Sequence, residues 1–290
     1  MSHFYKKRHF YALVLPMLIM FIIFMIVPII INVVYSFTDA HSAFEPQYAG
    51  LTNYKRLFQD KYFGYAIRNT FIVCAVLIIT IIPTSFFIAY TLNRQTKTNN
   101  AIKTIIFAPY IISAALTALI WSFVFNPSTG FINNFLELIG LASWKQAWIN
   151  GPVLSPYSFA IVGAWAGMGF YVTLWQVGIR SIPTDVLEAG LIDGTTKWQQ
   201  VRLIMLPMLK DTFGAILVFV ITGGLKCFEY VDIMTGGGPL YQSETIVSYM
   251  YTSMFTNAQH GYTMTMAVIL FIFAMAATII VKRLTRVEKD

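Results

Sequence analysis

The sequence predicts an all-α polytopic membrane protein with about six transmembrane helices. Of its 290 residues, 57% are hydrophobic and only 11% are charged, so the bilayer must be its main solvent. Apolar stretches long enough to cross roughly 30 Å of hydrocarbon recur along the whole chain. Their approximate bounds are Tyr11–Ser36, Ala66–Leu92, Thr104–Phe125, Ser158–Ile179, Thr212–Val231 and Tyr262–Val281.

The first crossing follows a short basic segment, Lys6, Lys7 and Arg8. About 26 uncharged residues then run from Ala12 to Phe37, which is longer than the apolar core of a signal peptide. We therefore expect a transmembrane helix here and not a cleaved signal.

Helix-breaking residues occur within several of the predicted crossings. Proline removes an amide donor and tends to kink a helix, which packed membrane helices tolerate. The fifth crossing is the least regular, because Lys226 and Glu229 interrupt its far end. The prolines within the predicted helices are Pro16, Pro28, Pro83 and Pro109.

One connecting segment, Gly130–Leu141, has helical periodicity. Phe131, Phe135 and Leu138 recur near helical spacing, which suits a short helix lying at the membrane interface. An ordinary loop is the alternative, because the segment is short. With no soluble domain indicated, we predict a single transmembrane domain over residues 1–290.

The distribution of positive charge predicts the orientation of the chain. The net charge of +7 would suggest nucleic acid in a soluble protein, but here Lys and Arg lie mostly between or beyond the apolar runs. Six crossings place both termini on one side. That side or its loops hold Lys6, Lys7, Arg8, Arg94, Lys97, Lys103, Arg180, Lys197, Arg202, Lys210, Lys282, Arg283, Arg286 and Lys289. The other side or its margin has Lys55, Arg56, Lys61, Arg68 and Lys145. The positive-inside rule therefore predicts cytoplasmic termini.

The loop between the fourth and fifth crossings, Ser181–Pro207, reads as two short helices. Pro183 and Thr184 give a helix-start signal, and acidic residues follow in the first turns, where the helix dipole favours them. Gly194 allows a tight break, after which Thr195 or Thr196 can cap the second helix. The predicted hairpin lies on the cytoplasmic side and is a candidate docking surface.

This loop resembles the EAA loop of ABC import permeases. Glu188-Ala189-Gly190 is followed after three residues by Gly194, and after nine more by Ile204-x-Leu206-Pro207, which reproduces the family spacing. Gly190 stands where the family usually has a second Ala, and both residues are small.

Further segments resemble the carbohydrate branch of that family, which contains the maltose-type and glycerol-phosphate-type permeases. Each segment is weak alone, and their order and spacing carry the resemblance. They are Pro28 with Ser36-Phe37-Thr38, Gly50-Leu51-x-Asn53-Tyr54, Asp60-x-x-Phe63 with Asn69-Thr70, and Thr235-Gly236-Gly237-Gly238-Pro239 followed by Thr245 and Gly261-Tyr262.

The resemblance implies a bacterial inner-membrane permease subunit that is not itself an enzyme. An extracellular binding protein would deliver a sugar or oligosaccharide, and this chain would form the pathway with a second, homologous permease. Two separate ATPase subunits would bind ATP and Mg, and this chain has no G-x-x-x-x-G-K-[ST] phosphate loop. We expect no cofactor or metal on the chain itself, since Cys74 and Cys227 lack the spacing of a metal or redox motif.

The resemblance also implies roles for the residues of the hairpin. ATP-driven closure must reach the membrane through a rigid contact. Glu188 would meet a basic residue of the ATPase and Leu191 would fill an apolar cleft. Alternatively, Glu188 only stabilises its own helix start. The predicted coupling residues are Glu188, Ala189, Gly190, Leu191, Asp193, Gly194, Ile204, Leu206 and Pro207.

Candidate solute contacts lie in and near the later crossings. Sugars present hydroxyls and apolar ring faces, so their sites mix aromatic platforms with hydrogen-bonding groups. Ionisable residues such as Lys226, Glu229 and Asp232 are costly in a membrane and tend to face a cavity or each other. Lys226 and Glu229 could instead pair on one helix face, and each aromatic could instead pack or anchor at the interface. The candidate pathway residues are Trp121, Trp165, Tyr171, Trp175, Lys226, Phe228, Glu229 and Tyr230.

Three alternative functions remain. Within the family, the solute could be a glycerol phosphodiester, a polyol or an amino acid. A secondary transporter would need a coupling-ion site near mid-membrane and would leave the EAA spacing unexplained. A membrane-embedded enzyme would need convergent polar residues, and the histidines do not converge, since His3, His9, His41 and His260 lie in terminal or loop regions.

Overall fold

The computed structural model describes residues 7–39, 46–149, 151 and 153–285, with side chains from residue 13 onward. This part of the chain is helical apart from turns, loops and one isolated bridge between Thr38 and Tyr48. It holds 5 helices long and apolar enough to cross a membrane, or up to 6 if one bent pair counts as a single span. The predicted all-α class with about six crossings is confirmed.

The chain divides into two compact units, residues 1–60 with 250–271, and residues 61–249 with 272–290. The first unit contains α1 (Lys7–Phe21), the π-helical turn η1 (Ile22–Ile26), α2 (Val27–Tyr35), α3 (Thr52–Gln59) and η4 (Thr252–Thr256). It also contains the first part of α15 (His260–Thr285). The π-helical turn η1 ends just before α2, whose second residue is Pro28, one of the prolines predicted within this crossing.

Within the first unit, segments that carry the family resemblance meet through hydrogen bonds. The Asn53 amide donates to the carbonyl of Thr38 at 2.7 Å, and the Thr265 hydroxyl donates to the carbonyl of Ser36 at 3.1 Å. The Tyr262 hydroxyl donates to the carboxylate of Asp60. These contacts join the end of α2 to α3 and to the start of α15. Polar groups buried there need hydrogen-bond partners, since leaving them unpaired would be costly.

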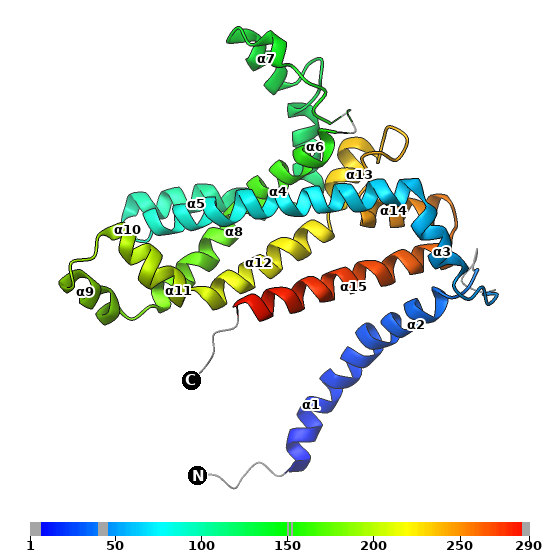
Figure 1. Cartoon of the computed structure of the whole chain (residues 1–290), viewed down its shortest axis with the longest axis horizontal. Helices are drawn as coiled ribbons and strands as arrows, with labels where there is room; N and C mark the ends of the chain where they lie inside the picture. Colours follow the sequence, from blue (N-terminus) through cyan, green and yellow to red (C-terminus); the bar gives the residue numbers. More distant parts are fainter. Residues whose placement is uncertain (1–6, 40–45, 150, 152, 286–290) are drawn as a thin grey trace. The chain divides into compact units, whose positions relative to one another are not determined.

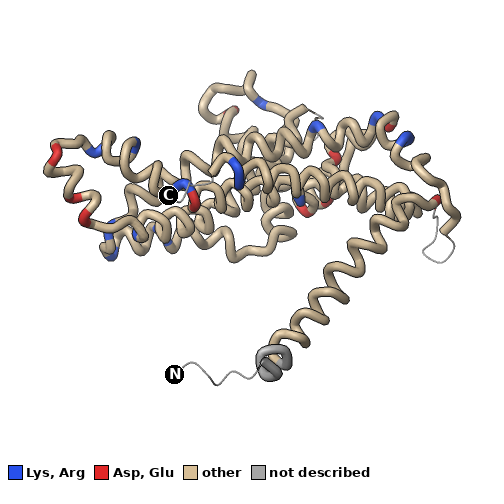
Figure 2. The backbone as a smooth tube through the Cα atoms, turned by 60° about the horizontal axis from the view of Figure 1, so that its bottom comes forward, with Lys and Arg blue, Asp and Glu red and all other residues tan. Residues whose placement is uncertain are grey.

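The second unit is a helix bundle built on α4 (Lys61–Thr91), α5 (Lys97–Ile111), α8 (Ser155–Ser181) and α12 (Lys210–Leu225). α8 packs along α4 and α5, and α12 packs against α4 and α8 (Figure 1). Buried Val73, Ile81, Phe159 and Ile216 form part of its core. Charged residues of this unit gather over the hairpin of α9 and α10 at one end (Figure 2).

The third predicted crossing is not a straight helix. α5 ends at Ile111 and α6 (Ala114–Val124) leaves it at an angle of 97°. Ile112 is extended, and the Ser113 hydroxyl accepts a hydrogen bond from the Leu116 amide at 3.3 Å, which caps α6. The break follows Pro109, in agreement with the kink predicted there.

The fifth predicted crossing lies in a single candidate span of 26 residues, Lys210–Thr235, but its helix is interrupted at the place where its two charges occur. Lys226 caps the end of α12, and Glu229 begins α13 (Glu229–Thr235). The intervening carbonyl of Cys227 accepts a hydrogen bond from the Thr245 hydroxyl at 2.6 Å, just before α14 (Ile246–Tyr251). A hydroxyl from a distant segment therefore satisfies a backbone group that the broken helix leaves free.

The periodic segment after α6 forms a helix, as predicted. α7 (Phe131–Leu138) is followed by the 3-10 turn η2 (Ala142–Trp144), and it extends away from the bundle beyond α6 (Figure 1). Buried Asn133 holds the segment together by donating to the carbonyls of Pro127 and Gln146 at 2.9 Å each and accepting from the Trp148 indole at 2.8 Å. The apolar ring of Phe131 points outward, which leaves an exposed apolar face.

Candidate functional site

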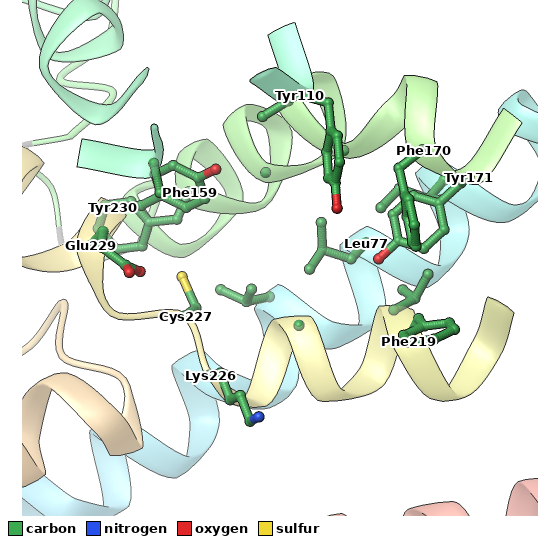
Figure 3. Close-up of a pocket in the computed structure, with 18 of the residues that line it drawn as sticks. Leu77, Tyr110, Phe159, Phe170, Tyr171, Phe219, Lys226, Cys227, Glu229 and Tyr230 are labelled. Atoms are coloured by element: carbon green, nitrogen blue, oxygen red, sulfur yellow. The ribbon is translucent and has the colours of Figure 1, made fainter. Parts of the chain in front are cut away.

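A cavity of about 540 Å³ lies in the second unit, lined by residues from both helix breaks (Figure 3). Pro109 and Tyr110 come from the α5–α6 break, and Lys226, Cys227 and Glu229 come from the α12–α13 break. Mid-sections of α4 and α8 complete the wall, which is mainly apolar and aromatic. A concave apolar site with a few polar groups is the usual form of a small-molecule site.

One end of the cavity is an aromatic cluster. The rings of Tyr110 and Phe170 stack with centroids 5.1 Å apart and planes 13° apart. Phe170 meets Tyr171 and Phe219 edge to face, at 5.3 Å and 5.8 Å. Figure 3 shows these four side chains gathered at one end, on α5, α8 and α12. Such clusters present flat apolar faces together with phenol hydroxyls, the combination that a sugar ring requires.

The other end of the cavity carries the ionisable groups. Glu229 and Tyr230 lie beside Cys227 and Phe159, and Lys226 stands at the end of α12 (Figure 3). Lys226 and Glu229, both within the described residues, form no ion pair with each other. The break between α12 and α13 separates them, so the alternative that they pair on one helix face is wrong.

Small residues on α8 and α12 make room for the cavity. Gly163 and Gly167 lie one helical turn apart on α8 and line it together with Gly223 of α12. A Cβ atom at Gly167 would lie 3.1 Å from the Tyr171 ring, and one at Gly163 would lie 3.4 Å from the Tyr230 ring. Side chains at these positions would therefore occupy the space between the two tyrosines and α8.

The predicted pathway residues divide into two groups in the structure. The structure brings Tyr171, Lys226, Glu229 and Tyr230 to the cavity, and the other candidates do not line it. Trp121 and Trp165 form an edge-to-face pair of their own, with centroids 5.5 Å apart. Phe228 lies in the α12–α13 break.

Trp175 needs a correction, because it belongs to the core. Its side chain is 1% exposed, and its indole donates to the Ser85 hydroxyl at 3.1 Å. The ring of Phe86 packs against it edge to face at 5.1 Å. Neighbouring helices cover the indole, so it presents no face to the cavity.

Several cavity residues were not anticipated from the sequence: Tyr110, Phe159, Phe170 and Phe219. The sequence did contain a signal for Tyr110, because this residue directly follows Pro109 at the predicted kink. Broken membrane helices commonly line binding sites. The three phenylalanines lie in evenly apolar helices, where no local pattern separates a cavity residue from a core residue.

The loop between α8 and α12 forms the predicted helical hairpin. α9 (Thr184–Ile192) is followed by a turn at Gly194, then by α10 (Lys197–Gln199), η3 (Gln200–Met205) and α11 (Leu206–Met208). Gly194 has φ +80°, a conformation that glycine adopts without strain. Thr196, one of the two predicted caps, accepts from the Gln199 amide at 3.3 Å and forms a capping box.

The two arms of the hairpin pack closely. The Gln200 amide donates to the carbonyl of Leu187 at 2.9 Å, and the Thr195 hydroxyl donates to the carbonyl of Gly190 at 2.6 Å. A Cβ atom at Gly190 would lie 2.6 Å from Cδ1 of Ile204, so the small residue in the Glu-Ala-Gly segment permits this contact. The hairpin is therefore a braced unit and not a loose loop.

The hairpin also presents an apolar surface. Ile192 is 86% exposed and Trp198 is 69% exposed, and Leu191 and Glu188 are exposed near them. Leu187 instead packs inward against the core, so the apolar side chains of α9 divide between the inside and the surface. Large apolar side chains beside a free carboxylate are typical of a protein contact.

The chain has clear relatives. Residues 81–287 match the protein family described as "Binding-protein-dependent transport system inner membrane component". A probable ABC transporter permease protein of Bacillus subtilis, YurN, is 31% identical over 284 residues, which cover 97% of each chain. A probable permease protein for starch degradation products from Thermoanaerobacterium thermosulfurigenes, AmyD, is 28% identical over 98% of this chain and 97% of its own.

Solved structures agree with these relatives. A chain of a bacterial ABC transporter that imports the acidic polysaccharide alginate has a TM-score of 0.83 and 25% identity, and the match covers 98% of this chain and 97% of that one. A second structure of a bacterial alginate transporter, in complex with a pentasaccharide-bound periplasmic protein, also has a TM-score of 0.83, over 97% and 94% of the two chains.

Proposed function

The chain belongs to the family of inner membrane components of binding-protein-dependent transport systems, and on that premise we propose that it forms half of the pathway of an ABC importer for a sugar or oligosaccharide. A second, homologous permease forms the other half. A binding protein outside the membrane delivers the solute. Two ATPase subunits on the cytoplasmic side bind ATP and Mg and drive the transport cycle.

The observation that carries this proposal is the cavity lined by the sharp α5–α6 bend and by the interruption between α12 and α13. Broken helices place backbone and polar groups at membrane depth, where a solute in transit meets them. The aromatic cluster around Tyr110 and Phe170 supports a ligand with flat apolar faces. Glu229 and the hydroxyls of Tyr171 and Tyr230 supply acceptors and donors for sugar hydroxyls.

The hairpin supports coupling to an ATPase on the cytoplasmic side. Its braced arms transmit a displacement, and its exposed surface of Leu191, Ile192 and Trp198 beside Glu188 suits an apolar cleft with a basic rim. The predicted coupling residues have two different roles in the hairpin. Gly190, Gly194 and Ile204 allow its arms to pack together, and Glu188 and Leu191 lie on its exposed surface.

One observation favours a second candidate solute, an anionic non-sugar such as a glycerol phosphodiester. Lys226 lies at the cavity rim and forms no ion pair with Glu229. A free ammonium group suits a phosphate, which Lys binds as a point charge. The two candidate solutes predict different effects of Lys226→Gln. The substitution would abolish selective uptake of an anion, and it would leave uptake of a neutral oligosaccharide nearly unchanged.

Uptake by the reconstituted importer tests the proposal. Labelled mono- and oligosaccharides and a glycerol phosphodiester are offered to proteoliposomes that contain the complete complex, its binding protein and internal ATP. We expect ATP-dependent uptake of an oligosaccharide and an increase of several-fold in KM for Tyr110→Ala, since stacking contributes on the order of a kcal/mol. Phe87→Ala is the matched control, because Phe87 is an exposed aromatic of α4 that does not line the cavity. Uptake driven by an ion gradient without ATP would contradict the proposal.

A further inference from the structure

A second cavity of about 300 Å³ lies in a groove between α5 and α8, apart from the solute cavity. Lys103 and Gln176 line it near the end of the bundle that carries the hairpin, and Ile111 lines it deeper. The Gln176 amide donates to the carbonyl of Leu92 at 3.4 Å, which places this end of the groove beside the C-terminal end of α4. We propose that the groove binds the headgroup and upper acyl chain of an anionic phospholipid from the leaflet on the hairpin side.

The end of the groove near the hairpin is positively charged. Lys103 is half-buried in its wall, and Arg180 lies one helical turn beyond Gln176 on α8. Lys103 and Arg180 therefore bring two positive charges to the hairpin end of the groove. Within the described part of the chain neither cation forms an ion pair with a carboxylate. A bound phosphate would offset these two positive charges, and basic pockets between membrane helices bind lipid headgroups in this way.

The groove changes from polar to apolar along its length. Thr104 and Thr173 line the part near Lys103, and Phe107, Ala108 and Ile111 line the rest. From Lys103 to Ile111, α5 rises by about 12 Å, which is the depth from a headgroup to the upper acyl chain. A soluble anion would use only the charged end. A phospholipid matches both parts, because its charged phosphate lies at one end and its hydrocarbon follows, in the same order as the charged and apolar parts of the groove.

The packing of the two helices makes the groove a permanent feature. α5 and α8 touch backbone to backbone at Gly169, where a Cβ atom would lie 2.4 Å from Cα of Phe107. This close contact fixes the separation of the helices beside it. The inference rests on the proposed cytoplasmic position of the hairpin, because the inner leaflet is the anionic one.

Native mass spectrometry of the full-length chain tests the inference. The purified chain is delipidated and offered phosphatidylglycerol or phosphatidylcholine. We expect selective retention of phosphatidylglycerol, and about fivefold weaker retention by Lys103→Gln, which is the contribution of one basic residue near an anionic headgroup. Lys97→Gln is the matched control, because Lys97 is an exposed residue of α5 that does not line the groove. Ala108→Trp is the second variant, since it fills the apolar part at an exposed position and leaves the charge unchanged.

Loss of retention in both groove variants, with normal retention in Lys97→Gln, would support the inference. Equal retention of the two lipids, or normal retention in both groove variants, would overturn it. Displacement of bound lipid by soluble glycerol phosphate would also overturn it, because the groove would then be a site for a soluble anion. The assay measures neither uptake nor ATP hydrolysis, so its failure leaves the proposed transport function intact.

Discussion

Replacement of Gly194 by valine tests the coupling role of the hairpin most directly. Gly194 has φ +80°, and a Cβ atom there would meet nothing within 4 Å. The substitution therefore introduces backbone strain without a steric clash. An L-residue in this left-handed conformation costs about 1–2 kcal/mol, and a β-branched residue lies at the upper end. That strain shifts the population of the native turn by a factor of about 5–30.

Gly140 provides a matched control for this substitution. It has φ +79°, and a Cβ atom there also meets nothing within 4 Å, so Gly140→Val introduces the same strain. Gly140 follows α7, however, and lies outside the hairpin. Any difference between the two variants therefore comes from position and not from the cost of the backbone conformation.

The assay is co-purification of the ATPase subunits together with ATP hydrolysis stimulated by the loaded binding protein in reconstituted membranes. We expect Gly194→Val to lose stimulated hydrolysis about fivefold or more, in line with the population shift, and Gly140→Val to retain it. The affinity of the binding protein for the solute should be unchanged in both. Equal losses in the two variants, or normal stimulation in Gly194→Val, would refute the coupling role.

Four further outcomes follow from the structure. Glu188→Lys should detach or uncouple the ATPase, because it reverses an exposed charge, and Glu188→Gln should have a smaller effect on co-purification. The predicted topology places Arg94–Lys103 in the cytoplasm and Gly236–Gly261 outside. A cysteine at Thr98 should therefore resist labelling from outside, and one at Leu240, which is 73% exposed, should react. The reverse labelling pattern would overturn the topology. Trp175→Ala should lower stability by roughly 3–5 kcal/mol in thermal unfolding, because it empties a core site, and Trp165→Ala, 40% exposed, should change it far less. Tyr171→Ala and Tyr230→Ala should raise the uptake KM severalfold while the complex still assembles, each loss being on the order of a kcal/mol; normal uptake in both would place solute binding elsewhere.

Much of this protein follows from local properties of its sequence. The number and order of the crossings depend on the length and polarity of each segment, which hydropathy records directly. The hairpin is equally local, because Pro183, Gly194 and Thr196 act through their own backbone conformations and hydrogen bonds. The two irregular crossings were also visible in part, since Pro109 and Lys226 mark the places where α5 and α12 end.

The identity of the cavity residues depended on tertiary packing. Tyr171 and Trp175 are one turn apart on α8, so helical periodicity places both on nearly the same face. Ser85, Phe86 and Phe213 cover Trp175, whereas Gly167 and Gly223 leave space beside Tyr171. The hydropathy of a residue describes its preference for the membrane or the protein interior as a whole. Whether an aromatic ring meets a neighbouring helix or an open cavity is decided by the residues that other helices bring to the same depth, and only the assembled bundle determines that.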